Sequence, residues 1–416
     1  MTRMSKRTGL RLFIASPLIY PPRGGAELRF WRYLPGLRAR GVEVQLVTGT
    51  PKAKKISPED HSAPWYHFRP GQTIPLKPVD GVPIHQIRLP DKNGWRRTII
   101  YNRHLVETCR RLHPDVVQLL TPLPVKSLPW LLRLKRFGIG LVYSITLAPK
   151  PAKGPLLPAK RMLRKILFGA IDGVIVSSST IKELVSAEIP ADKIVKIPNG
   201  VDIRLFSPAT FQEKEALRRE LGLPADSKII LNVGSIHPRK RVDLLLNAWR
   251  SVADEYPNAI LLLVGPRHDL TDPALAPYAK KLKGLVSSSG HADRVLFLGS
   301  VDRVQDYYKA ADLFVFSSAK EGMPNAVLEA MATGLPVITT PFIGLSDDFG
   351  MPGQHYVLAD PAPERLSSTI IELLSDPRRM REVGNAARRL ISNTMDREKV
   401  LDRYVQLYSS VASRIG

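Results

Sequence analysis

The sequence has one cysteine, Cys109, and no apolar run of about 18 residues, the length that spans a bilayer. A single cysteine excludes an internal disulfide and fits a reducing compartment. We interpret Cys109 as a buried, small apolar residue of a helix. The apolar run near the N-terminus is broken by Pro17 and lacks a small-residue cleavage site, so it predicts a buried first strand rather than a secretion signal. The expected location is cytoplasmic.

Patterns that hold divalent metals are also missing. The sequence contains neither an Asp-x-Asp triplet nor a spaced group of histidine and cysteine ligands. We therefore expect no metal site and no cofactor.

Acidic residues are scarce in the first half of the chain. Residues 1–200 hold 34 Lys and Arg against 12 Asp and Glu, a net charge of +22, whereas residues 201–416 are nearly neutral at +1. This asymmetry favours an anionic partner for the first half: a membrane surface, a phosphorylated lipid or an acidic glycan. The alternative is a basic surface that only contacts solvent. Nucleic acid is not expected, because no RNA- or DNA-binding signature accompanies the charge.

What the sequence does contain is a regular alternation of apolar strand-length runs and amphipathic helical stretches. In the first half the runs include RLFIAS, VEVQLVTG, DVVQLL and GVIVSSS; in the second, KIILNVG, AILLLVG, DLFVFSS and PVITT. Near-continuous apolar strands that alternate with helices indicate parallel sheets covered on both faces. The pattern predicts an α/β protein with two doubly wound, Rossmann-like domains that face a shared cleft.

The 416-residue length also favours two domains. Turn-forming residues in IPNGVDIRLFSP place the boundary there, so we expect an N-terminal domain over 1–198 and a C-terminal domain over 199–394. The last helix, within 395–416, is a candidate to cross back onto the N-terminal domain. The Pro-rich stretch 51–81 is expected to be a loop.

The first motif is PPRGGAELR, which follows the first strand. Gly24 and Gly25 remove side chains where backbone amides and a helix N-terminus could meet an anion. The same glycines also fit a tight strand-to-helix turn.

The second motif, LNVGSIHPRKRVDLLLNA, follows the first strand of the second domain. Gly234 allows the chain to turn, and Arg239 and Lys240 precede a helix. Cations are unfavourable at a helix N-terminus, so their presence favours a phosphate ligand there. The alternative is a solvated basic face.

The third motif is AKEGMPNAVLEAMATGLPVITT. Glu321 follows a strand, and we expect a helix that starts at Pro324 and stops at Gly334. Amides at that helix start could receive a diphosphate. Glu329, one turn further, could accept hydrogen bonds from a ribose, and Glu321 could bind sugar hydroxyls. Alternatively, both glutamates are favourable charges near a helix start.

In combination, these motifs resemble the family 4 retaining glycosyltransferases with the GT-B fold. Glu321 and Glu329 match that family's paired glutamates, and Lys240 matches its phosphate-binding lysine. The resemblance implies Lys240 and Glu321 as catalytic residues and Gly24 and Gly25 as an acceptor or phosphate loop. It implies a donor site made of Gly234, Arg239, Lys240, Val301, Gly322, Met323, Pro324, Asn325, Ala326, Val327 and Glu329.

Two positions depart from the family pattern. Ser235 stands where many relatives have an arginine, and Arg239 is the candidate to supply the missing charge. Thr146 stands about where many relatives have a histidine at a strand end, and the other candidate strand end offers Gln118 and Thr121. No general base can be named from the sequence.

The resemblance implies metal-independent transfer of a sugar, with retention, from a nucleoside-diphosphate sugar to a glycan or lipid-linked acceptor of cell-envelope or polysaccharide biosynthesis. Three other functional hypotheses remain open: a non-catalytic binder of nucleotide sugars, a nucleic-acid-binding protein, and a phosphorylase or epimerase on a similar fold. Residues 153–171 place Lys160, Arg161, Arg164 and Lys165 among apolar residues. This segment predicts either peripheral contact with an anionic membrane or a core-facing helix with a basic solvent side.

Overall fold

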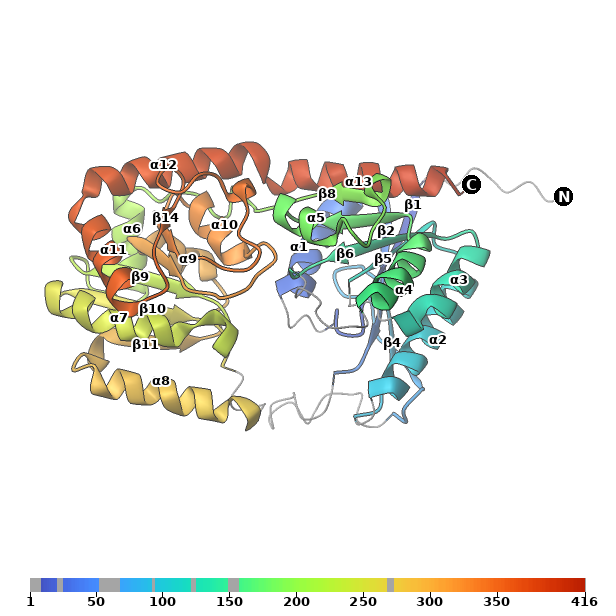
Figure 1. Ribbon diagram of the computed structural model, residues 1–416, viewed down its shortest axis with the longest axis horizontal. Helices are drawn as coiled ribbons and strands as arrows, with labels where there is room; N and C mark the ends of the chain where they lie inside the picture. The colour runs from blue at the N-terminus through green and yellow to red at the C-terminus, as the bar shows by residue number, and fades with distance from the viewer. Residues whose placement is uncertain are drawn as a thin grey trace. The chain divides into compact units, whose positions relative to one another are not determined.

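The computed structural model describes residues 9–20, 25–51, 68–91, 94–120, 125–148, 157–267 and 273–415, with backbone alone for 125, 157–160 and 273 (Figure 1). The chain forms two compact units. The first comprises Met1–Pro198 with Val400–Gly416, and the second comprises Asn199–Lys399. Each contains a mainly parallel sheet covered by helices on both faces, so the α/β prediction is confirmed.

The first unit has an eight-stranded sheet in the order β3-β4-β2-β1-β5-β6-β7-β8. All described pairings are parallel except that of β3 with β4. The strands are β1 Leu10–Ala15, β2 Val42–Gly49, β3 Thr73–Ile74, β4 Ile84–Ile87, β5 Val116–Leu119, β6 Gly140–Ile145, β7 Gly173–Val176 and β8 Ile194–Lys196. Strand β3 corrects the prediction of a loop over 51–81, of which residues 52–67 lie outside the described residues: its two residues form the edge of the sheet and pair with β4.

Two helical layers cover this sheet. Helices α1 and α13 share one buried cluster, and α2, α3, α4 and α5 share the other. The helices are α1 Gly25–Ala39, α2 Gly94–Leu112, α3 Leu128–Arg136, α4 Leu157–Gly169, α5 Ser179–Val185 and α13 Arg397–Ser413, with 3-10 turns η4 Val125–Ser127 and η5 Ala191–Lys193. Cys109 lies on α2 and is fully buried, and burial raises its thiol pKa, as expected for a packing residue.

The second unit has a six-stranded parallel sheet in the order β11-β10-β9-β12-β13-β14. Its strands are β9 Lys228–Val233, β10 Ala259–Val264, β11 Val295–Gly299, β12 Leu313–Phe316, β13 Val337–Thr339 and β14 Val357–Leu358. Helices α7, α8 and α11 cover one face, and α9, α10 and α12 the other. The helices are α6 Phe211–Glu220, α7 Val242–Glu255, α8 Ala276–Ser288, α9 Val304–Ala310, α10 Asn325–Ala332, α11 Pro363–Ser375 and α12 Pro377–Thr394, with 3-10 turns η6 Pro238–Lys240, η7 Pro273–Leu275, η8 Ala292–Arg294 and η9 Asp347–Phe349.

Each sheet has one point where the strand order reverses. In the first unit it lies between β1 and β5, and in the second between β9 and β12. In open α/β sheets ligands bind beyond the carboxyl ends of the strands at such a point. Candidate binding residues are therefore expected in the segments that follow β1, β5, β9 and β12. Among the helices of the described ranges, none is both long and apolar enough to cross a membrane.

Candidate functional site

The segments after β9 and β12 hold the second and third sequence motifs. Gly234 directly follows β9, and its amide donates to the Val264 carbonyl at the end of β10 (2.8 Å). A Cβ at Gly234 would lie 3.4 Å from Cε of Lys240, and one at Gly265 would lie 2.1 Å from the Gly234 carbonyl oxygen. Glycines at both places therefore allow the backbones to meet and leave room for the Lys240 side chain.

The basic turn η6 is fixed to the end of β12 by two serines. The Ser317 hydroxyl donates to the Lys240 and Arg241 carbonyls, both at 3.0 Å, and the Ser318 hydroxyl to the Arg239 carbonyl at 3.2 Å. Within the turn, Nδ1 of His237 accepts from the Arg239 amide (3.1 Å). The backbone that carries both cations is thus held in place before any ligand arrives.

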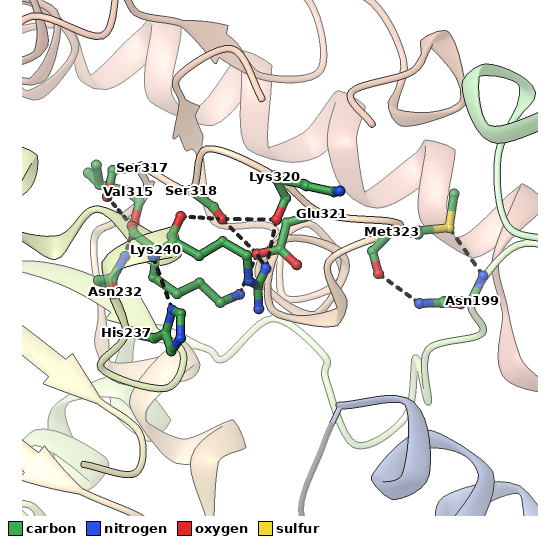
Figure 2. Close-up of polar contacts among 11 residues, drawn as sticks. Asn199, Asn232, His237, Lys240, Val315, Ser317, Ser318, Lys320, Glu321 and Met323 are labelled. Carbon is green, nitrogen blue, oxygen red and sulfur yellow. Dashed lines mark hydrogen bonds and ion pairs between the residues drawn. The ribbon is translucent and has the colours of Figure 1, made fainter. Parts of the chain in front are cut away.

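Two cationic side chains converge on one carboxylate oxygen of Glu321; Figure 2 labels Lys240 and Glu321 of this cluster. Nζ of Lys240 lies 2.7 Å from Oε1 of Glu321, and Nη1 of Arg239 pairs with the same oxygen. The Ser318 hydroxyl also donates to it (2.7 Å), and Arg239 further donates to the Lys320 carbonyl (2.7 Å). Arg239 therefore lies beside Lys240 and supplies a second cation at the site.

This cluster carries an unbalanced charge. Burial opposes ionisation of Glu321, but Lys240 and Arg239 outweigh it, so the pKa of Glu321 lies below its ordinary value. The pKa of Lys240 is also lowered, because burial outweighs the attraction of Glu321 and Arg239 adds a like charge. The directions agree physically: the carboxylate faces two cations, whereas the cations share one carboxylate. With all three groups ionised, one positive charge is in excess and suits an anionic ligand.

The third motif forms the loop before α10. Helix α10 begins at Asn325, one residue later than expected, because the Pro324 carbonyl accepts from the Val327 and Leu328 amides and so acts as the N-cap. The stop is as predicted, with Gly334 at φ +75° after the last turn. The Asn199 side-chain amide donates to the Met323 carbonyl and to Oδ1 of Asn325, both at 2.7 Å, and fixes the loop.

Glu329 lies one turn into α10 and is 7% exposed. Oε2 of Glu329 accepts from the Tyr308 hydroxyl (3.1 Å), which also donates to the Ala326 carbonyl (3.1 Å). This tyrosine orients the carboxylate. A buried carboxylate held by a phenol can still accept hydroxyl hydrogen bonds on its remaining lone pairs.

The other predicted donor residues have mainly packing roles in the described structure. Met323 and Val327 belong to the buried cluster between the sheet and α10, with Val301 and Ala326 packed against it. Gly322 is buried beside Glu321. In the first unit, Gly25 is the first residue of α1, and no heavy atom of the described residues lies within 4 Å of a Cβ built on it. Gly24 lies outside the described residues.

The strand ends of the first unit do not share one role. Gln118 is fully buried: its amide donates to the Ser144 hydroxyl (3.0 Å) and its oxygen accepts from the Tyr408 hydroxyl (3.1 Å). These bonds give Gln118 a structural role. Thr146 is half-buried just after β6, and Thr121 lies outside the described residues.

Several residues that hold the site were not predicted from the sequence. Asn199, Tyr308, Ser317 and Ser318 were not named, although Ser317 and Ser318 end a predicted strand and Asn199 belongs to an Asn-Gly turn. A polar pair directly after a buried strand was the available signal. No sequence pattern marks Tyr308, because a tyrosine in an amphipathic helix is typical of a core residue.

Two family profiles together account for most of the chain. "Glycosyl transferases group 1" matches residues 213–390, and "Glycosyltransferase Family 4" matches residues 23–205. The chain belongs to the family 4 glycosyltransferases. The order and spacing of the motifs described above agree with that membership.

Comparison with individual proteins also finds glycosyltransferases. This glycosyltransferase is 27% identical to D-inositol 3-phosphate glycosyltransferase of Kineococcus radiotolerans, over 92% of this chain and 91% of that protein. It is 31% identical to a GDP-mannose-dependent monoacylated alpha-(1-6)-phosphatidylinositol monomannoside mannosyltransferase of Corynebacterium glutamicum, over 56% and 61%. HepE of Anabaena, solved in complex with UDP and glucose, matches at a TM-score of 0.71 and 19% identity, over 96% of this chain and 100% of HepE. The fold is GT-B.

Proposed function

We propose that this glycosyltransferase moves a sugar from a nucleoside-diphosphate sugar to a glycan or lipid-linked acceptor, with retention of configuration and without a metal. The observation that carries the proposal is the cluster of Arg239, Lys240 and Glu321 at the reversal point of the second sheet. Its excess positive charge suits a diphosphate, and HepE, a protein of the same fold, was solved with UDP.

The cluster suggests how the leaving group is stabilised. Glycosyl transfer proceeds through an oxocarbenium-like transition state, and negative charge builds on the departing diphosphate. Lys240 and Arg239 would bind that charge when a phosphate competes with Glu321 for them. Glu321, thus released from part of its pairing, could accept hydroxyl hydrogen bonds from the sugar. Two side-chain cations would supply the positive charge that a metal supplies in other transferases.

The same cluster bears on the non-catalytic alternative. That alternative rested in part on Ser235, which stands where many relatives have an arginine. Arg239 reaches the shared carboxylate oxygen from four residues further on, so the site holds two cations. The position of Ser235 therefore no longer counts against transfer, because Arg239 supplies the second cation.

The first unit supports an anionic partner for the acceptor side. Helices α2, α3 and α4 bury Leu105, Leu131 and Leu167 on one face of the sheet. Across these helices the sequence has twelve Lys and Arg and one acidic residue, Glu107. We name this layer the basic face. Exposed apolar side chains accompany its charges: Trp95, Ile99, Leu132, Met162, Leu163 and Ile166, of which Met162 is 65% exposed.

Charge and exposed apolar groups together favour a lipid surface over a soluble anion. The headgroup layer of a membrane accepts apolar side chains as well as basic ones, whereas a small soluble anion gains little from exposed apolar groups. On α4, Met162, Leu163 and Ile166 lie on neighbouring helical positions beside Arg161 and Lys165, which are exposed. We therefore propose that the protein works at the cytoplasmic face of an anionic membrane, on an acceptor of cell-envelope or polysaccharide biosynthesis.

A donor screen followed by product analysis tests the function. Purified protein is heated with UDP-, GDP-, ADP- and TDP-sugars, and we expect one class to raise the melting temperature. The stabilising sugar nucleotide is then incubated with membrane lipid extract, with and without excess chelator. Retention, glycolipid formation and unchanged yield with chelator are expected. Release of free nucleotide without a glycosylated product, conversion of the donor to its epimer, or loss of activity with chelator would each contradict the corresponding part of the proposal.

A further inference from the structure

His237 directly precedes the cationic turn η6, and two amide groups of that turn depend on it. Nδ1 of the His237 ring accepts from the Arg239 amide (3.1 Å), and the His237 carbonyl oxygen accepts from the Lys240 amide (2.8 Å). The first residue of the turn, Pro238, has no amide hydrogen. His237 is therefore the N-cap of the turn and binds the amides of both residues whose side chains pair with Glu321. Figure 2 labels His237 beside Lys240.

The turn needs support because part of its backbone is strained. Arg241, which closes the turn, lies in the left-handed region at φ +50°, and residues other than glycine adopt that conformation at an energetic cost. The two serines that follow β12 bind carbonyl groups of the turn. The amide side is held by His237 and by the Pro238 carbonyl, which accepts from the Arg241 amide (3.1 Å). Loss of the His237 ring would therefore free one side of the turn.

The charge of the cap matters because the turn carries cations. Asparagine and aspartate are among the side chains most often found at an N-cap. An aspartate would bind the same amide, but its charge would offset the single positive charge in excess at Arg239, Lys240 and Glu321. A ring nitrogen that accepts an N–H bond carries no proton, so the His237 ring is neutral, with its proton on Nε2. Histidine thus caps the turn without reducing its attraction for an anion.

We propose that His237 is a positioning residue that caps the cationic turn as a neutral acceptor and so holds Arg239 and Lys240 ready for the diphosphate. This role rests on the proposed function, because it requires that a diphosphate binds at the turn. It deepens that function by naming the residue that sets both the geometry and the net charge of the turn.

Binding of inorganic pyrophosphate to the full-length protein tests this role without a nucleotide or a sugar, by calorimetry at constant ionic strength. We expect His237→Ala to weaken binding about fivefold, because the turn loses its side-chain cap. His237→Asn supplies a neutral oxygen acceptor and should keep the affinity within about twofold of the parent protein. His237→Asp supplies the same oxygen with a negative charge and should weaken binding about tenfold or more.

Thermal stability separates positioning from folding. Thr210→Ala removes another side-chain cap of the second unit, where Oγ1 of Thr210 accepts from the Glu213 amide (3.2 Å). This control should lower the melting temperature as His237→Ala does, and it should leave pyrophosphate binding unchanged. If His237→Ala fails to fold, the asparagine and aspartate variants still decide, because both retain a cap and differ in charge. Their kcat values with the donor found by the screen should follow their pyrophosphate affinities.

The outcomes distinguish this role from the proposed function. Equal pyrophosphate affinity in the asparagine and aspartate variants, or parent-like affinity in a folded His237→Ala, would overturn the role of His237. If Lys240→Ala also leaves pyrophosphate binding unchanged, the turn is not a diphosphate site, and the account of leaving-group stabilisation fails as well. If Lys240→Ala weakens binding and the His237 variants do not, only the role of His237 fails.

Discussion

Arg239 and Lys240 pair with the same oxygen of Glu321, so one carboxylate faces two cations. Among the described residues Glu321 is the anionic partner of both cations, so each of them can pair with a second anion at little cost. Ser317 and Ser318 hold the backbone of the turn, so the charges need not reorganise when a diphosphate binds.

We expect Lys240→Ala to lower kcat by about 10²- to 10³-fold with little loss of thermal stability, because a group that stabilises the leaving phosphates acts mainly in the transition state. Arg239→Ala should lower kcat in the same way but less, since Arg239 is more exposed than Lys240. Steady-state kinetics with the donor found by the screen measures both. Arg378→Ala on α12 removes an exposed, paired arginine and is the control. Wild-type kcat in Lys240→Ala would remove this lysine from the mechanism.

Helix α13 completes the core of the first unit, although it is the last helix in the sequence. Its buried residues include Leu401, Tyr404 and Tyr408, which belong to the same cluster as α1. The helices approach closely at Gly36, where a Cβ would lie 2.3 Å from Cδ1 of Leu401. Glycine in the middle of α1 therefore has a packing reason that outweighs its cost to the helix.

We predict that Leu401→Ala lowers the free energy of unfolding of the first unit by about 2–4 kcal/mol, because it leaves a cavity between two helices. Gly36→Ala should be destabilising in the parent protein and much less so beside Leu401→Ala, because the shortened side chain makes room for the methyl group. Denaturant unfolding followed by hydrogen exchange of β1 and β5 measures these effects. Leu184→Ala, at an exposed position of α5, is the control. Additive effects of the two substitutions would show that the helices do not meet there.

On the scale of the whole molecule, charge is divided unevenly. The first 200 residues carry +22 and the remainder +1, and the basic face concentrates this charge on one helical layer. Some of these charges are paired, as Lys135 is with Asp172 and Arg164 with Glu188. Arg161 and Lys165 of α4 are exposed beside apolar side chains, and they are the residues whose removal should affect lipid binding most.

We expect the protein to sediment with vesicles that contain phosphatidylglycerol but not with pure phosphatidylcholine, and to be released by added salt, because exposed charges are screened over about 8–10 Å at physiological ionic strength. Arg161→Gln with Lys165→Gln should weaken this binding about tenfold or more, at roughly 1 kcal/mol per basic residue. Lys280→Gln with Lys283→Gln, on exposed positions of α8, removes the same charge from the second unit and is the control. Equal losses for the two pairs would show that net charge, rather than the basic face, binds the membrane.

The sequence by itself determined the α/β class, most of the strands, and the motifs that carry Gly234, Lys240, Glu321 and Glu329. These features are local, because apolar runs, turn residues and motif spacing depend only on short stretches of sequence. Strand β3 was missed because a two-residue edge strand has too little pattern to be recognised.

Only the tertiary structure decided which side chains meet. Arg239 and Glu321 are 82 residues apart, and their ion pair exists because β9 and β12 are neighbours in the sheet. The addition of Val400–Gly416 to the first unit depends in the same way on α1 and α13, which pack together although more than 350 residues separate them in the chain. The periodicity of apolar residues predicts which face of a helix is buried. Which segment covers that face depends on packing between parts of the chain that are distant in sequence, so it cannot be read from a local pattern.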